Sequence, residues 1–160
     1  MKQLEKILKE LEEKIPSASF TNPYISSSSV GWHIEHVLLS MDRIVEAMLA
    51  SNPATFKSTI SVRKFAVFTL GKIPRGRAKA PRAVRPGDDI TIEGLNAHFK
   101  QSLDLVKNIN TIRSDQYFEH PYFGHIRLKP AIRFIKIHTR HHLKIIEDIL
   151  RSAKPQPWQS

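Results

Sequence analysis

The sequence predicts an all-α protein, an up-down-type four-helix bundle with a long basic loop between its second and third helices. Four long segments place apolar residues at every third or fourth position, proline-containing links separate them, and no two segments read convincingly as paired strands. The 160 residues suffice for one domain with a buried core. We assign residues 1–153 to that domain and residues 154–160 to a polar C-terminal tail.

The first two helices are predicted from their apolar stripes and from the residues that bound them. Residues 2–15 carry leucine and isoleucine at helical spacing, and Pro16 ends this helix. A link rich in Ser, Thr, Asn and Pro follows, and the serines at 26–29 are N-cap candidates for a second helix that reaches about Ser51. The stripe of this helix comprises Val30, Ile34, Val37, Met41, Ile44, Val45 and Met48.

The middle of the chain combines a short helix with the basic loop. The apolar segment that starts at Ser61 is interpreted as a short helix ending near Gly71, and the prolines and glycines that follow require a loop. Eight Lys and Arg residues and no acid lie between Arg63 and Gly87. Most of the formal net charge of +10 therefore comes from one stretch of the chain.

Two further helices complete the predicted bundle. One spans residues 91–109, with Thr91 at its N-terminus, and the other runs from about Pro130 to about Ala153, because proline is favoured in a first helical turn. The sequence HPYFGH precedes the last helix. Its two aromatic residues are expected either to plug the end of the bundle or to form the rim of a site.

Composition excludes several classes of protein. Because the chain has no cysteine, disulfides, thiolate metal ligands and a cysteine nucleophile are excluded. The N-terminal residues mix charge with leucine and isoleucine, unlike a signal peptide, and no uncharged apolar run of about 20 residues is present. We therefore expect a cytoplasmic protein without a membrane partner.

The histidines are the most informative residues for function. His138 and His142 are one helical turn apart within the apolar stripe of the last helix, so both imidazoles can share one divalent ion. The alternative is that neighbouring carbonyls or a polar cleft satisfy them. A third ligand has to come from another helix, and the second helix offers His33 and His36. Periodicity does not choose between these two, because His33 lies at the edge of the main stripe and His36 lies near a second apolar group.

Two segments resemble a known family. The stretch SSVGWHIEHVLLSMDRIVEAM is similar to the metal-site helix of the DinB-like superfamily, which includes the YfiT-like proteins. The stretch HPYFGHIRLKPAIRFIKIHTRHHLKIIEDIL resembles the C-terminal signature of that superfamily, which carries His-x-x-x-His. The resemblance implies His36, His138 and His142 as ligands of nickel, zinc or manganese, and it makes a homodimer plausible. The basic loop departs from many relatives, which have a shorter link.

The resemblance also implies a reaction class. Three imidazoles leave a coordination position for water or substrate, as in catalytic sites. We expect a metal-dependent hydrolase, or a transferase that uses a low-molecular-weight thiol, acting on a small and anionic substrate. Further candidates are Glu35 and Glu46 as general bases, His33, His120 and His125 as acid, base or orienting groups, and His141 beside the ligands. Each of these also has a structural interpretation, as a solvated carboxylate or a supporting histidine.

The rival interpretation is a non-catalytic protein that binds a polyanion or nucleic acid through the basic segment 63–87. Its candidate anion-binding residues are Arg75, Arg77, Lys79 and Arg82. Nucleic acid is the less favoured partner, because no aromatic residue follows Phe68 in this segment to stack on bases. A third possibility is a metal-stabilised scaffold in which a fourth protein ligand closes the site.

Overall fold

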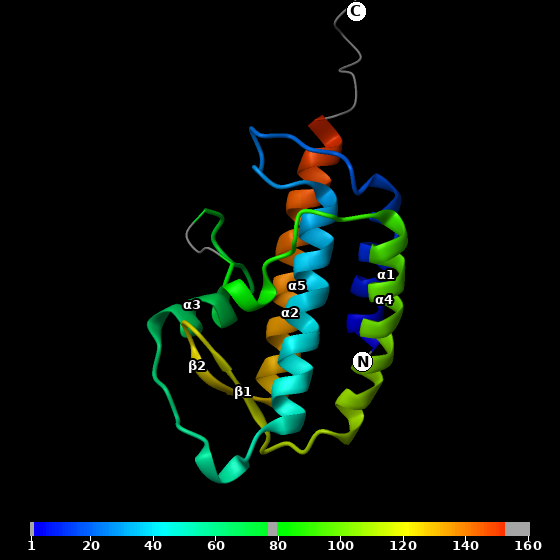
Figure 1. Cartoon of the computed structure of the whole chain (residues 1–160). Helices are drawn as coiled ribbons and strands as arrows, with labels where there is room; N and C mark the ends of the chain where they lie inside the picture. Colours follow the sequence, from blue (N-terminus) through cyan, green and yellow to red (C-terminus); the bar gives the residue numbers. More distant parts are fainter. Residues whose placement is uncertain (1, 77–79, 153–160) are drawn as a thin grey trace, which may run out of the picture.

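The chain is mostly helical, as predicted, and its four longest helices lie side by side (Figure 1). The computed structural model describes residues 2–76 and 80–152. The helices and strands are α1 (Lys2–Glu12), α2 (Val30–Ala50), α3 (Val62–Leu70), α4 (Ile92–Lys107), β1 (Tyr117–His120), β2 (Gly124–Arg127) and α5 (Leu128–Ser152). Short 3-10 turns are η1 (Ile15–Ser17), η2 (Pro53–Thr55), η3 (Arg82–Val84) and η4 (Asn108–Thr111).

The order of helix directions explains the long connection in the middle of the chain. In the view of Figure 1, α1 and α5 run upward, whereas α2 and α4 both run downward. The helix α2 packs against α4 and α5, and α1 packs against α5. Because α2 and α4 run in the same direction, the connection between them has to return along the molecule, and its η3 turn contacts α2 on the way.

Several predicted helix ends are confirmed by their caps. The side chain of Ser29 accepts a hydrogen bond from the backbone N–H of Trp32 at the start of α2, and Thr91 caps α4 in the same way. Gly71 ends α3 with a positive φ of 61°, a conformation that suits glycine. The last helix begins at Leu128, slightly earlier than predicted. Pro130 therefore stands in its first turn, where a missing N–H costs little.

The expectation that the chain forms no strand pair is wrong. Residues 117–120 and 124–127 form an antiparallel hairpin, in which Phe118 pairs with Ile126, and the HPYFG sequence supplies its turn. Phe123 of this turn is buried, whereas Tyr122 is 44% exposed. The buried aromatic residues of the hairpin pack on Phe134 of α5, which holds the hairpin against the first half of that helix.

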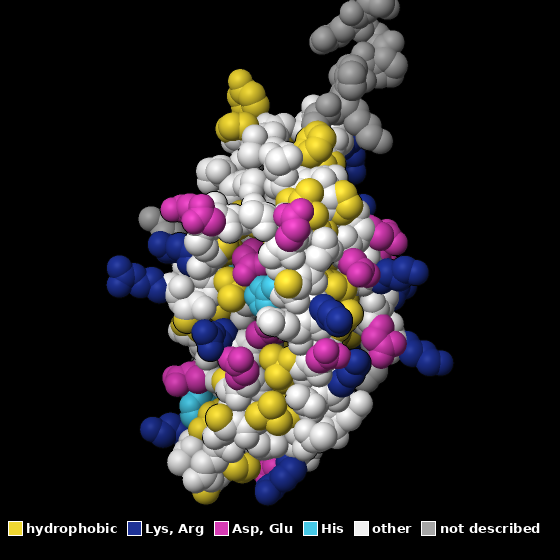
Figure 2. All heavy atoms as spheres, turned by 45° about the vertical axis from the view of Figure 1, so that its right-hand side comes forward, with side chains coloured by type: hydrophobic (Ala, Val, Ile, Leu, Met, Phe, Trp, Pro, Cys, Tyr) yellow, Lys and Arg dark blue, Asp and Glu magenta, His cyan; other side chains and the backbone are white. Residues whose placement is uncertain are grey.

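The core is built from the predicted stripes. Every apolar residue of the predicted α2 stripe is buried, as are Leu4, Ile7, Leu8 and Leu11 of α1. No helix in the described part of the chain is long and apolar enough to cross a membrane. On the face that carries α1 and α4, acidic and basic side chains are interspersed (Figure 2). The polar tail at 154–160, together with Arg77 and Lys79 of the basic segment, lies outside the described residues.

Candidate metal centre

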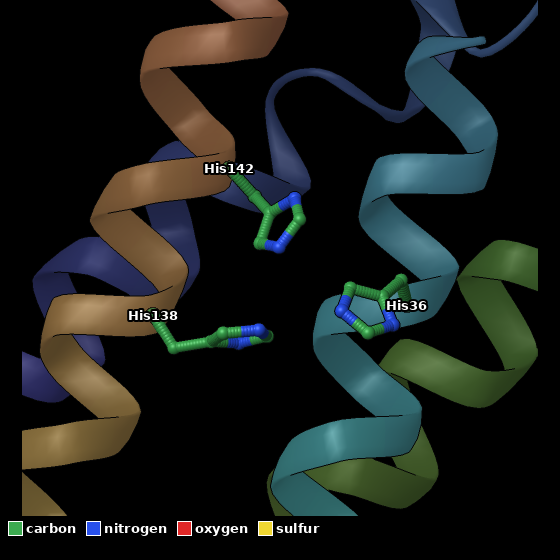
Figure 3. Close-up of side chains that lie close together, drawn as sticks. All are labelled: His36, His138 and His142. Carbon is green, nitrogen blue, oxygen red and sulfur yellow. The ribbon is translucent and has the colours of Figure 1, made fainter. Parts of the chain in front are cut away.

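Three histidines from two helices meet in the middle of the molecule. His36 comes from α2, and His138 and His142 come from successive turns of α5. One ring nitrogen of each lies within 4.8 Å of the corresponding nitrogen of the other two. Figure 3 shows the three imidazoles pointing into the space between the helices. This is the set of residues that the family resemblance selected.

The environment of the three rings favours neutral imidazole. His36 and His142 are 5% and 7% exposed. Burial lowers the pKa of His36 and lowers the pKa of both His138 and His142 well below the usual value. The neighbouring histidines lower the pKa of His138 and His142 further, since two imidazolium ions would repel each other. A neutral ring is the form that can ligate a metal.

The basic segment orients His36. Nδ1 of His36 lies 2.7 Å from the carbonyl oxygen of Val84, which belongs to the η3 turn. A carbonyl only accepts, so Nδ1 carries the proton and donates it to Val84. Nε2 of His36 is then left with a free lone pair. Metal-ligating histidines are commonly oriented by this kind of contact, in which the second ring nitrogen donates to a carbonyl or carboxylate.

A second contact orients His142 through His33. Nδ1 of His142 lies 3.0 Å from Nδ1 of His33, and Nε2 of His33 lies 2.9 Å from the hydroxyl of Ser26. If His142 donates from Nδ1, its Nε2 is free to ligate, and His33 then carries its proton on Nε2 and donates it to Ser26. His33 is therefore placed behind a candidate ligand and outside the three-histidine group.

Arg75 of the basic segment acts on two histidines that lie beside the three-histidine group. Its guanidinium donates to the carboxylate of Asp148 on α5 at 2.8 Å. Its positive charge also contributes to the lowered pKa of His33 and of His141, after burial in both cases. His141 is next to His142 on α5 and is half-buried. Arg82, the remaining described anion-binding candidate, is exposed at the start of η3.

Glu35 lies away from the three histidines, in a polar network between α2 and α4. Its carboxylate is 2.9 Å from Nδ1 of His98, and Nε2 of His98 donates to Asp42 at 3.0 Å. The hydroxyl of Ser102 also donates to Asp42, at 2.9 Å. Hydrogen bonds to Asp42 and then to Glu35 raise the pKa of His98 to about 9. Sequence reasoning missed His98, although two carboxylates seven residues apart on one helix face were a signal for it.

The other candidate acids and bases have structural contacts. Glu46 pairs with Arg43 on the exposed side of α2. His125 accepts a hydrogen bond from the backbone N–H of Lys57 and stacks on Tyr117. His120 stacks on Phe123, with ring centroids 4.1 Å apart, and burial lowers its pKa to about 4. Of these three residues, only His120 is close enough to the cluster to contribute to the lowered pKa of His138.

The three-histidine group fits a divalent ion. Its donors are imidazole nitrogens, which suit zinc, nickel and other first-row metals. The contact with Val84 leaves Nε2 of His36 free to ligate, and the contact with His33 leaves Nε2 of His142 free when His142 donates from Nδ1. An ion would also remove the cost of burying neutral polar rings close together.

The chain belongs to the DinB superfamily, whose family model matches residues 3–146. Among curated proteins and solved structures, no match was found. The match covers α1 through most of α5 and therefore includes all three histidines of the group.

Proposed function

We propose that this DinB superfamily protein is a metal-dependent enzyme in which His36, His138 and His142 hold one divalent ion within a four-helix bundle. The observation that supports this most directly is the convergence of three neutral imidazoles from two helices, two of them buried and that of His138 partly buried. Three protein ligands leave at least one coordination position for a reactant, which distinguishes a catalytic site from a closed structural one. Nickel, zinc and manganese are all candidates for the ion.

The residues around the ligands hold them in place for that role. A bound divalent ion would lower the pKa of a coordinated water or thiol and polarise a carbonyl group. Val84 orients the ring of His36, and His33 orients the ring of His142, in contacts that engage Nδ1 of each ring. Because these contacts exist before any ligand arrives, little ordering is needed when the ion binds.

A thiol-dependent transferase is the reaction class that we favour. Hydrolysis of a bond that is stable in water needs a general base that takes a proton from the attacking water molecule. Glu35 faces His98 on α4, and Glu46 pairs with Arg43, so neither carboxylate serves that purpose. A thiol that coordinates the ion is deprotonated by it and needs no separate base. The low-molecular-weight thiol would thus be the nucleophile: it would lose its proton to solvent, and its sulfur would form a bond to an electrophilic atom of a small substrate while a leaving group departs with the electron pair of the broken bond.

A metal-dependent hydrolase is the second candidate, and His141 is the observation that supports it. This residue adjoins His142, and burial together with Arg75 lowers its pKa, so its ring is neutral near pH 7. A neutral imidazole is a competent base. Arg75 also makes an anionic substrate plausible for either reaction, since its guanidinium lies near the cluster and is only partly occupied by Asp148.

The first experiment is the metal content of the untagged protein, measured by elemental mass spectrometry beside a His138→Ala/His142→Ala variant. We expect about one ion per chain in the parent and none in the variant. We then measure how fast the parent protein consumes small electrophilic substrates, with and without an added low-molecular-weight thiol. Turnover that requires both ion and thiol supports the transferase, and turnover without thiol supports the hydrolase. A parent that stays empty after incubation with each metal contradicts the proposal.

The rival proposal of polyanion binding through residues 63–87 is tested on the same protein. Part of this segment orients His36 through Val84, which supports a role in the metal centre. Replacing Arg82 with Gln, at an exposed position, should leave metal content unchanged. Tight, salt-sensitive binding of duplex RNA by the metal-free protein would favour the rival.

A further inference from the structure

The charges of the chain are strongly segregated. Residues 47–87 contain nine Lys and Arg residues, and residues 120–146 contain six, yet neither stretch contains an Asp or a Glu. All 15 acidic residues lie elsewhere, where they outnumber the cations. The two acid-free stretches contact each other. Phe68 of α3 stacks with Phe134 of α5, and Lys64 donates to the carbonyl of His125. Arg63 and Lys64 of α3 and the cations of the first half of α5 therefore lie on neighbouring elements.

The helix α3, which lies in the first acid-free stretch, exposes apolar side chains. Val62, Phe65 and Leu70 are 82%, 72% and 69% exposed, and the preceding Ile60 is 99% exposed. Only Val67 of this helix is buried. Four large apolar side chains exposed on and just before one short helix, which also carries Arg63 and Lys64, are unusual for a surface that faces only water.

A groove next to α3 extends this surface along α5. It has a volume of about 600 Å³, with Phe68 and Ile137 among its apolar lining. Its cations are Lys129, Arg133, Lys136 and Arg140, which follow one another at helical spacing along α5. None of the four forms an ion pair with a carboxylate in the part of the chain that the structure describes. Like charges at this spacing repel, so an anionic partner would stabilise them.

We propose that this surface, called the α3 surface and made of the four exposed apolar residues and the four groove cations, docks on an anionic membrane. Interfacial helices bind membranes by placing apolar side chains at the headgroup boundary while Lys and Arg contact anionic lipids. Such docking is peripheral and needs no spanning helix. It revises the sequence-based expectation of no membrane partner, which rested on the lack of a spanning segment.

The exposed apolar residues distinguish a membrane from a nucleic acid. Phosphates of RNA or DNA would satisfy the cations, but they give Ile60, Val62 and Leu70 no apolar environment. A membrane satisfies both kinds of side chain at once. The two partners therefore predict different results when only the apolar residues are changed.

Vesicle co-sedimentation of the full chain tests the proposal. We expect binding to vesicles of phosphatidylglycerol and phosphatidylcholine at moderate salt, and weak or no binding to phosphatidylcholine alone. Val62→Ser/Phe65→Ser should weaken binding at least about tenfold, because two apolar side chains no longer leave water. Lys129→Gln/Arg140→Gln should also weaken it by about tenfold or more, because each cation contributes attraction to anionic lipid.

Matched controls separate the α3 surface from general effects. Tyr24→Ser removes a 98% exposed aromatic residue elsewhere, and Lys6→Gln/Lys9→Gln removes two exposed cations of α1. Both variants should bind vesicles like the parent, and circular dichroism should show all variants folded. Equal binding to both kinds of vesicle, or no binding to either, overturns the proposal. So does an apolar variant that binds like the parent, because the apolar side chains would then contribute nothing and the attraction would be purely electrostatic.

Discussion

At the scale of single residues, the candidate site depends on which nitrogen of each ring carries a proton. Val84 accepts from Nδ1 of His36, and this contact alone fixes that tautomer. The pair formed by His33 and His142 has two possible tautomers, because either Nδ1 can donate to the other. An ion on Nε2 of His142 selects one of them, and the proton of His33 then faces Ser26. Metal binding and the direction of this chain of hydrogen bonds are therefore linked.

The first prediction concerns His33. In His33→Ala, Nδ1 of His142 loses its partner, so the ring is held less firmly and the buried N–H is left unsatisfied. Metal affinity should fall about 10- to 100-fold while the fold is retained. Competition titration with a chromophoric chelator measures the change. His125→Ala, a change in the hairpin, should leave the affinity unaltered. An unchanged affinity in His33→Ala would show that His33 does not position His142.

Periodicity identified the two histidines of α5 but left the third uncertain for a physical reason. Both His33 and His36 are buried, 4% and 5% exposed, because α2 is covered on several sides by α5, α4 and the η3 turn. A helix that is buried on several sides has no single inward stripe. Only the family resemblance selected His36. The contact between His36 and Val84 could not be predicted from the sequence, since the two residues are 48 positions apart and Val84 belongs to an irregular connection.

At the scale of elements, α2 is the helix on which both polar networks depend. One side of it presents His36 to α5, and another side presents Glu35 and Asp42 to His98 of α4. His98 joins two carboxylates and is charged near neutral pH, since its pKa is raised to about 9. The same network keeps Glu35 away from the metal centre. The packing of α4 on α2 therefore also determines that Glu35 binds His98 and is not available as a base at the metal centre.

The second prediction follows from the raised pKa of His98. The folded state binds this proton more tightly than the unfolded chain, whose histidine has a pKa of about 6.5. The stabilisation is complete below about pH 6.5 and disappears as the pH rises through about 9. His98→Gln should reduce the free energy of unfolding by about 1–2 kcal/mol at pH 6, allowing for solvent screening, and by little at pH 10. Denaturant unfolding at both values measures this, and a difference that is the same at both would contradict it.

The hairpin is the element that the sequence did not reveal. Its strands are four residues each, too short for alternation to stand out, and β1 alone contains two aromatic residues, an acid and a histidine. The long helices were predictable because their stripes repeat over many turns. The hairpin instead depends on tertiary contacts, in which Phe118 and Phe123 pack on Phe134 and Thr59 closes over Gly124.

The third prediction tests the close contact between Thr59 and Gly124. Gly124 has a φ of 64°, and a Cβ there would collide with the side chain of Thr59. Gly124→Ala should therefore lower the free energy of unfolding by about 1–3 kcal/mol, from the unfavourable backbone conformation and the displaced threonine. Gly87→Ala is the matched control, because the φ of Gly87 is not positive and no atom beyond its two chain neighbours lies within 4 Å of the added Cβ. Thermal unfolding compares the two, and equal stability would show that the turn adapts freely.

At the scale of the whole molecule, the candidate centre joins parts of the chain that are far apart in sequence. His36 and His142 are separated by more than 100 residues, and the connection between α2 and α4 supplies Val84 to the same site. An ion bound there would link α2, α5 and, through His36, the basic segment. Binding of metal would then stabilise the position of the basic segment as well as the positions of the ligand helices.

The last prediction is that metal stabilises the entire fold. An ion that binds the native state and hardly binds the unfolded chain adds about 2.7 kcal/mol when its free concentration is 100 times the dissociation constant. For a chain of this length, that corresponds to a rise of roughly 5–10 °C in Tm. Calorimetry of the chelator-treated protein, before and after adding nickel, zinc or manganese, measures the rise and ranks the three ions. His138→Ala/His142→Ala should show no such rise. If the variant is stabilised as much as the parent, the ion binds elsewhere and the three-histidine centre is not the site.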